Sequence, residues 1–175
     1  MTKIDLDNLN EESVYTKEER AFKFIHIQGA HSPYRYNKNV EKITNATYET
    51  NVQACMTITK RYLDMLKEAG VYDNSVILVM ADHGYEGGLA QGVDRQNPIL
   101  FVKGFDENHA LLLNDAPISY EDLQDAYVEL LDGKQSNEIF PYQEGDVRER
   151  KYLLYALNNK DIMYEYIQTG HAKDM

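Results

Sequence analysis

An aspartate and a histidine stand side by side at the end of an apolar segment of this 175-residue chain. The apolar residues 76–81 are followed directly by Asp82, His83 and Gly84. A carboxylate and an imidazole that directly follow a strand can both turn toward one cation. Such oxygen and nitrogen donors suit zinc or manganese. Gly84 lets the backbone turn sharply and approach a ligand closely. The pair predicts half of a metal site, but spacing alone leaves open that Asp82 caps a loop and His83 lies on the surface.

Two further side chains suit a substrate anion. His31 lies in the turn-rich residues 29–39 and has the chemistry to bind a metal or an anionic oxygen. Arg95 precedes another apolar run, and its guanidinium suits forked hydrogen bonds to a tetrahedral oxyanion. The alternatives are a loop histidine that touches nothing and a solvated arginine. His26, by contrast, falls within an apolar run, and we expect it to be packed.

The elements that must position these residues follow from hydrophobic periodicity. The runs 22–27, 76–81 and 98–102 predict strands. Helical spacing predicts a helix over residues 47–69, which Gly70 ends. The expected apolar face of that helix comprises Val52, Cys55, Met56, Thr59, Leu63 and Leu66.

Nearer the C-terminus, Ser119 has the chemistry of an N-cap, with Asp122 three residues later and Gly133 as the stop. The expected apolar face of this second helix comprises Leu123, Ala126, Tyr127 and Leu130. The segments 151–156 and 162–167 flank turn-forming residues and predict a β-hairpin.

This order of elements predicts an α/β fold: a partial doubly wound, mostly parallel sheet flanked by helices, with a C-terminal antiparallel hairpin. Residues 22–81 would form a right-handed parallel crossover. Such sheets place ligand groups beyond the carboxyl ends of their strands. Both polar clusters, residues 26–34 and 82–86, are expected there.

Charge and composition narrow the class of protein. The chain has 29 acidic and 18 basic residues, a net charge of -11, and no stripe of Lys and Arg, which argues against nucleic-acid binding. No apolar run approaches the roughly 18 residues of a membrane span, and no signal peptide is visible. We therefore expect these residues to be soluble. Cys55 is the one cysteine, so no internal disulfide forms.

Together the segments resemble the sulfatase-like branch of the alkaline phosphatase superfamily. That branch includes sulfatases, lipoteichoic acid synthases (phosphoglycerol transferases) and lipid A phosphoethanolamine transferases. The matching stretches, in order, are residues 24–34, 66–75, 76–84 and 97–104, with a weaker match at 163–167. The series in order is more specific than any single stretch, and it covers residues 20–130.

The resemblance implies that Asp82 and His83 ligate a divalent metal (Mn, Zn, Ca or Mg). It implies that His31 contacts the substrate or a second metal. In such enzymes a Thr, Ser or formylglycine nucleophile attacks phosphorus or sulfur, and the covalent intermediate passes to water or an acceptor hydroxyl. Phosphoethanolamine transferases carry a histidine near the position of Arg95. Arginine there favours the single-metal phosphoglycerol-transferase type.

The chain differs from the family in the region that precedes Phe22. The family's nucleophile and first acidic ligand precede the segment that matches Phe22, and no Cys/Ser-x-Pro-x-Arg signature is present. Residues 1–20 are polar and acidic, which predicts a lead-in or a short surface helix. The resemblance implies the C-terminal half of a sulfatase-like domain over 21–175, with no catalytic nucleophile in this chain. We expect an extracytoplasmic, membrane-anchored parent. We also expect an open sheet edge that self-associates or is covered by residues 1–20.

Two functions remain open from the sequence. In the first, the intact parent hydrolyses or transfers a phosphate or sulfate ester on a cell-envelope polymer, lipid or glycan. In the second, the chain is a catalytically inactive fragment or binding module that keeps the half-sheet without turnover.

Overall fold

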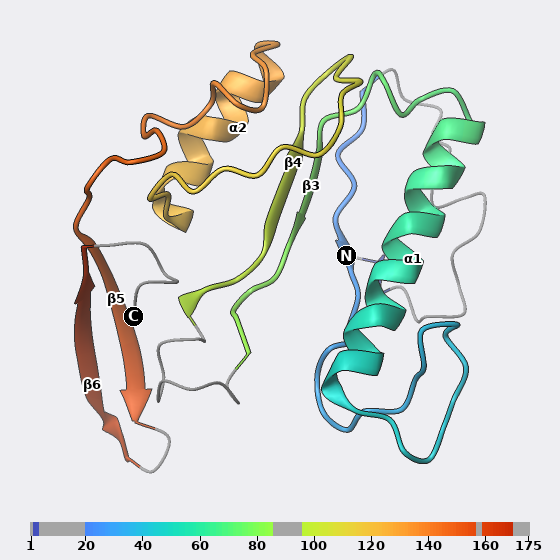
Figure 1. The fold of residues 1–175 in the computed structure, drawn as a ribbon, viewed down its shortest axis with the longest axis horizontal. Helices are drawn as coiled ribbons and strands as arrows, with labels where there is room; N and C mark the ends of the chain where they lie inside the picture. Colours follow the sequence, from blue (N-terminus) through green and yellow to red (C-terminus); the bar gives the residue numbers. More distant parts are fainter. Residues whose placement is uncertain (1, 4–19, 86–95, 157–158, 170–175) are drawn as a thin grey trace. The chain divides into compact units, whose positions relative to one another are not determined.

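The computed structural model describes residues 2–3, 20–85, 96–156 and 159–169 (Figure 1). The chain divides into two compact units, Met1–Asp73 and Asn74–Met175, and each is described by itself. Both units contain strands and at least one helix. The predicted mixture of helices and strands is therefore confirmed.

The first unit is organised around helix α1 (Tyr48–Glu68). Thr47 caps its N-terminus through reciprocal bonds with Thr50, and Gly70, with φ of 69°, follows its C-terminus in the left-handed conformation that glycine adopts at little cost. The predicted helix over residues 47–69 is thus confirmed. Its fully buried residues are Asn51, Ala54, Ile58 and Leu66.

The buried face of α1 differs from the predicted one. Of the six predicted residues only Leu66 is fully buried, and Met56 is exposed. The buried stripe runs instead through Asn51, Ala54 and Ile58. The predicted face lies to one side of the observed one because the prediction used hydrophobicity alone. It therefore gave no weight to a polar residue such as Asn51.

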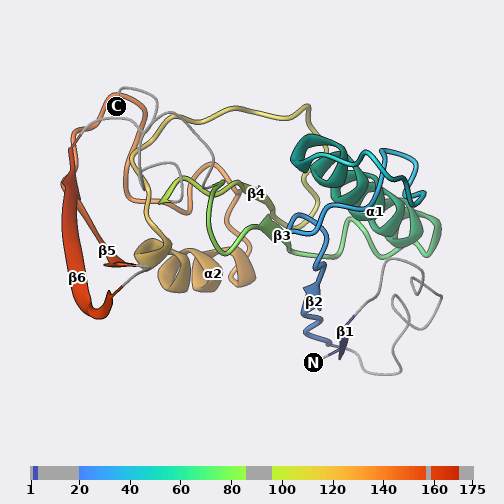
Figure 2. The same cartoon turned by 90° about the horizontal axis from the view of Figure 1, so that it is seen from below.

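Strand β2 (Ile25–His26) pairs in parallel with β1 (Thr2–Lys3). Figure 2 labels both short strands near the N-terminus. The strand predicted over residues 22–27 is therefore only partly formed. Phe24 is exposed, and His26 is exposed rather than packed as expected.

In the second unit, β3 (Ile77–Met80) pairs with β4 (Leu100–Lys103) in antiparallel register, with Met80 opposite Leu100. The predicted mostly parallel sheet is not supported, because β1–β2 is the one parallel pair among the described strands. An apolar run indicates a covered strand but not the direction of its neighbour, since the same side chains line the strand either way. The parallel crossover over 22–81 joins strands of two separate units and stays a prediction.

Helix α2 (Leu123–Leu131) covers β3 and β4 and follows a short 3-10 turn, η3 (Tyr120–Asp122). As predicted, Ser119 and Asp122 form a capping box, and Asp122 Oδ2 accepts from the Ser119 N–H at 2.7 Å. The core of the unit comprises Ala126, Leu130 and Ile139, packed by Val76, Leu78, Val102 and Phe140. The predicted apolar face is confirmed for Leu123, Ala126 and Leu130.

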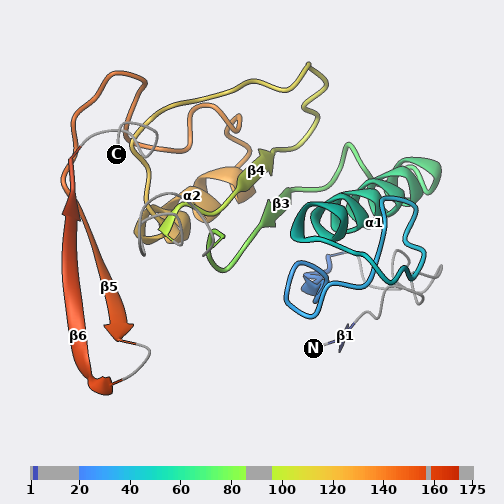
Figure 3. The ribbon, with the colours of Figure 1, turned by 60° about the horizontal axis from the view of Figure 1, so that its bottom comes forward.

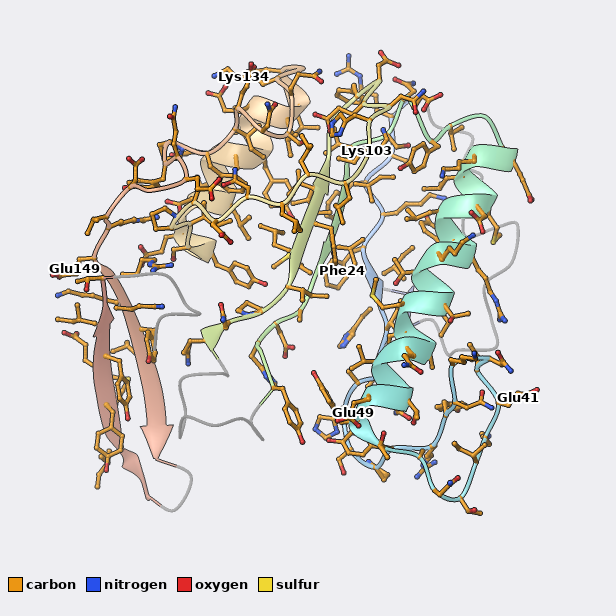
Figure 4. The ribbon with its side chains drawn as sticks, viewed as in Figure 1. Phe24, Glu41, Glu49, Lys103, Lys134 and Glu149 are labelled. Carbon is orange, nitrogen blue, oxygen red and sulfur yellow. The ribbon has the colours of Figure 1, made fainter. Side chains whose placement is uncertain are left out.

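A buried carboxylate anchors the end of β4. The Glu107 carboxylate accepts from the Gly104 N–H at 2.7 Å and from the Ser136 N–H beyond α2. Lys103, labelled in Figure 4, donates to the Ser75 carbonyl at 3.0 Å. Lys103 pairs with the first residue of β3, so all these bonds lie at one end of the β3–β4 ladder. The Lys103 bond connects β4 to Ser75, just before β3, and the Glu107 bonds connect the same end to the segment that follows α2.

The predicted hairpin is confirmed as β5 (Arg150–Ala156) and β6 (Asn159–Gln168), drawn as a long ribbon in Figure 3. The rings of Tyr152 and Tyr166 stack across it at 5.1 Å between centroids. Self-association through an open strand edge stays a prediction. Within the described part of the chain, no helix combines the length and apolarity needed to cross a bilayer.

Candidate functional site

Asp82 and His83 lie just beyond the end of β3, with donor atoms directed toward each other. Asp82 Oδ1 accepts from the His83 backbone N–H at 3.1 Å, and His83 Nε2 lies 3.8 Å from Asp82 Oδ2. The Asp82 side chain is 91% exposed and that of His83 37% exposed, so a ligand can reach both. The structure therefore brings one oxygen donor and one nitrogen donor together at a strand end.

The tautomer of a neutral His83 ring follows from the contact that its other nitrogen makes. Nδ1 lies 2.7 Å from the Gly84 carbonyl oxygen. A carbonyl only accepts, so in the neutral ring Nδ1 carries the proton and Nε2 keeps its lone pair. Metal-ligating histidines commonly hold their second nitrogen in this way, which orients the ring. Gly84 thus presents the free nitrogen of His83 on the side of Asp82.

The donor pair fits a divalent cation. Metal–ligand distances of about 2.1 Å in a tetrahedral site place neighbouring donors about 3.4 Å apart. The observed 3.8 Å between His83 Nε2 and Asp82 Oδ2 is close to this distance. Among the described residues, no group of three or more His, Cys, Asp and Glu side chains converges. Asp82 and His83 are thus a pair of candidate donors, one oxygen and one nitrogen, at the end of β3.

Tyr120 lies against the backbone that leads into this pair. Its hydroxyl donates to the Ala81 carbonyl at 2.5 Å and lies 3.5 Å from the Ile99 carbonyl oxygen. Burial raises the pKa of Tyr120 to about 12, with smaller contributions from the charges of Asp82 and Tyr127. The hydroxyl therefore remains a donor throughout the neutral range.

In the first unit, His31 occupies an exposed loop that is anchored to α1. Its Nδ1 lies 2.5 Å from the Ser32 carbonyl oxygen, which leaves Nε2 as the free nitrogen of the neutral ring. The anchor is Asn51, which is 2% exposed. Asn51 Oδ1 accepts from the Arg35 and Tyr36 N–H groups at 2.9 and 2.8 Å.

Asn51 also holds the start of the same loop, where the backbone passes close to α1. Its Nδ2 donates to the Gly29 carbonyl at 2.5 Å. Gly29 is buried, and a Cβ at this position would clash with Cys55 Sγ. Burial raises the pKa of the Cys55 thiol, so this cysteine stays protonated and is a poor nucleophile.

Sequence reasoning missed both Asn51 and Tyr120 as residues that bear on the candidate site. For each of the two residues, a pattern in the sequence could have indicated its role. Asn51 is a polar residue in register with Ala54 and Ile58 on the buried stripe of a helix. Tyr120 directly follows the N-cap Ser119, a position from which a side chain can reach a neighbouring strand end.

The structure places the predicted site residues as follows. Asp82 and His83 come together in the second unit. His31 belongs to the first unit, and its participation in the same site stays a prediction. Arg95 lies outside the described residues. His109 is exposed, with Nδ1 2.8 Å from the Ala110 carbonyl oxygen.

No protein-family model, curated protein or solved structure matches this chain. The resemblance to the sulfatase-like branch therefore stays a prediction that rests on the ordered stretches of the sequence.

Proposed function

We propose that this chain contributes Asp82 and His83 as metal ligands to a site that hydrolyses or transfers a phosphate or sulfate ester. One observation carries the proposal: the lone-pair nitrogen of His83 lies 3.8 Å from the Asp82 carboxylate while Gly84 holds the other ring nitrogen. The ordered sequence stretches that resemble sulfatases and phosphoglycerol transferases support the type of reaction. The substrate in this proposal is an ester of a cell-envelope polymer, lipid or glycan.

The roles of the chain's own residues follow from their chemistry. Asp82 supplies negative charge, and His83 supplies a neutral nitrogen whose direction is set by Gly84. A divalent cation bound there supplies Lewis-acid polarisation of the ester oxygens and activation of a nucleophile. His31 and Arg95 are proposed to hydrogen-bond the substrate oxygens.

The remaining parts of the site are proposed to come from a longer parent protein. In this proposal residues 21–175 form the C-terminal half of a sulfatase-like α/β domain. The nucleophile and a further acidic ligand then belong to the half that precedes it. The parent is proposed to be extracytoplasmic and membrane-anchored.

Metal binding by residues 1–175 tests the proposal directly. Asp82→Ala and His83→Ala are each expected to weaken Mn²⁺ or Zn²⁺ binding by at least about tenfold, because each removes one of two protein ligands. Isothermal titration calorimetry measures the affinity. Asp125→Ala and His109→Ala, which remove an exposed side chain of the same type, should leave it unchanged. Equal affinity in all four variants and the wild type would contradict the proposed site.

The second candidate function, an inactive fragment or binding module, is favoured by one observation. The sequence contains no Cys/Ser-x-Pro-x-Arg motif, and its one cysteine is a protonated, half-buried thiol. Residues 1–175 should then bind the metal without hydrolysing p-nitrophenyl phosphate or sulfate. Robust turnover that Asp82→Ala abolishes would exclude this candidate.

A further inference from the structure

We propose that Tyr120 is a positioning residue that holds the Asp82–His83 turn in its ligand-binding geometry. The inference rests on the proposed function for the chemistry of the site. The positioning itself is a property of the described residues and can be measured without metal.

The hydroxyl of Tyr120 lies where the β3–β4 ladder ends. The Ala81 N–H donates to the Ile99 carbonyl at 3.3 Å, and the chain then leaves the ladder at Asp82. The Ala81 carbonyl, which accepts from Tyr120 at 2.5 Å, belongs to the peptide plane that carries the Asp82 nitrogen. Because that plane is rigid, a bond to its oxygen restricts the rotation that would redirect the Asp82 Cα and its side chain.

Tyr120 is itself held by a network of fixed groups. It follows the N-cap Ser119 in a turn that the Ser119–Asp122 capping box closes. The Asp122 carboxylate accepts from Arg148 Nη1 at 2.5 Å, and the Arg148 guanidinium lies 4.3 Å from the centre of the Tyr142 ring. The hydroxyl therefore reaches the strand end from a backbone with little freedom to move.

The test compares wild type with Tyr120→Phe, which keeps the ring and removes the hydroxyl. Tyr164→Phe, a hydroxyl deletion at an exposed tyrosine of β6, is the matched control. Nitrogen chemical shifts of the His83 ring, recorded without metal at mildly alkaline pH, report which nitrogen carries the proton. Calorimetry with Mn²⁺ reports affinity, and thermal unfolding reports stability.

We expect Tyr120→Phe to shift His83 from the Nδ1–H form toward the Nε2–H form that free imidazole favours, and to weaken Mn²⁺ binding about threefold to tenfold. The Tyr164→Phe control should do neither. An unchanged ring signal overturns the inference, whether or not stability falls, since lost stability alone marks a structural role. If wild type binds no Mn²⁺ but Tyr120→Phe still shifts the ring signal, the proposed function fails while the positioning role stands.

Discussion

Asn51→Leu is expected to lower the free energy of unfolding of the first unit by about 3–5 kcal/mol. The substitution keeps the size of the side chain but removes three hydrogen bonds, to the Arg35 and Tyr36 N–H groups and the Gly29 carbonyl. A buried polar group left without a partner costs about 1–3 kcal/mol, and water can reach part of this exposed loop, so the losses do not sum fully. Denaturation in urea measures the change.

Two variants sharpen this prediction. Gln53→Leu introduces the same side chain at an exposed position of α1 and should change stability little. Asn51→Asp keeps the acceptor for Arg35 and Tyr36 but loses the donor to Gly29, so it should lie between Asn51→Leu and wild type. In Asn51→Leu, hydrogen exchange at the Arg35 and Tyr36 amides should accelerate. A stability equal to that of Gln53→Leu would show that Asn51 does not anchor the loop that carries His31.

Glu107→Ala is expected to destabilise the second unit by about 2–4 kcal/mol. Glu107 is 7% exposed, and its carboxylate is the acceptor for the Gly104 and Ser136 N–H groups. Both donors lose a charged partner in the variant, and hydrogen bonds to charged groups contribute more than neutral ones. Denaturation in urea measures the loss, with Glu144→Ala, at an exposed glutamate, as the control.

The Glu107 carboxylate should also make the stability of the second unit depend on pH. Burial by itself raises the pKa of Glu107, but bonds from the Ser136 and Gly104 backbone, aided by the Ser136 side chain and His109, together hold it below its usual 4.5. A carboxyl group whose pKa is lower in the folded than in the unfolded chain stabilises the folded chain at pH values above its unfolded-state pKa. This stabilisation is lost as the pH falls through the folded-state pKa. Wild type should therefore lose more stability below pH 4.5 than Glu107→Gln does. Parallel pH profiles of the two proteins would contradict this.

The local elements of this protein could be predicted from the sequence. The helix over residues 47–69, the Ser119–Asp122 cap and the C-terminal hairpin all appear in the structure. Each depends on neighbours a few residues apart, through helical periodicity, a capping side chain or turn chemistry, and such interactions form wherever the segment lies.

The pairing of strands could not be predicted in the same way. The apolar runs ending at Ala81 and beginning at Pro98 predict strands, but the structure shows them antiparallel, in a two-stranded ladder. Strand direction depends on which backbone hydrogen bonds form between distant segments, and side-chain hydrophobicity is the same in either direction.

The candidate site shows the same difference between local features, which could be predicted, and long-range contacts, which could not. The sequence by itself determined that Asp82 and His83 are adjacent beyond a strand, because they are neighbours in the chain. Only the tertiary structure decided that Asn51 anchors the His31 loop and that Tyr120 reaches the Ala81 carbonyl, 39 residues away in the chain. Such bonds depend on where separate elements pack, and that packing brings a donor and an acceptor together without any local pattern in the sequence.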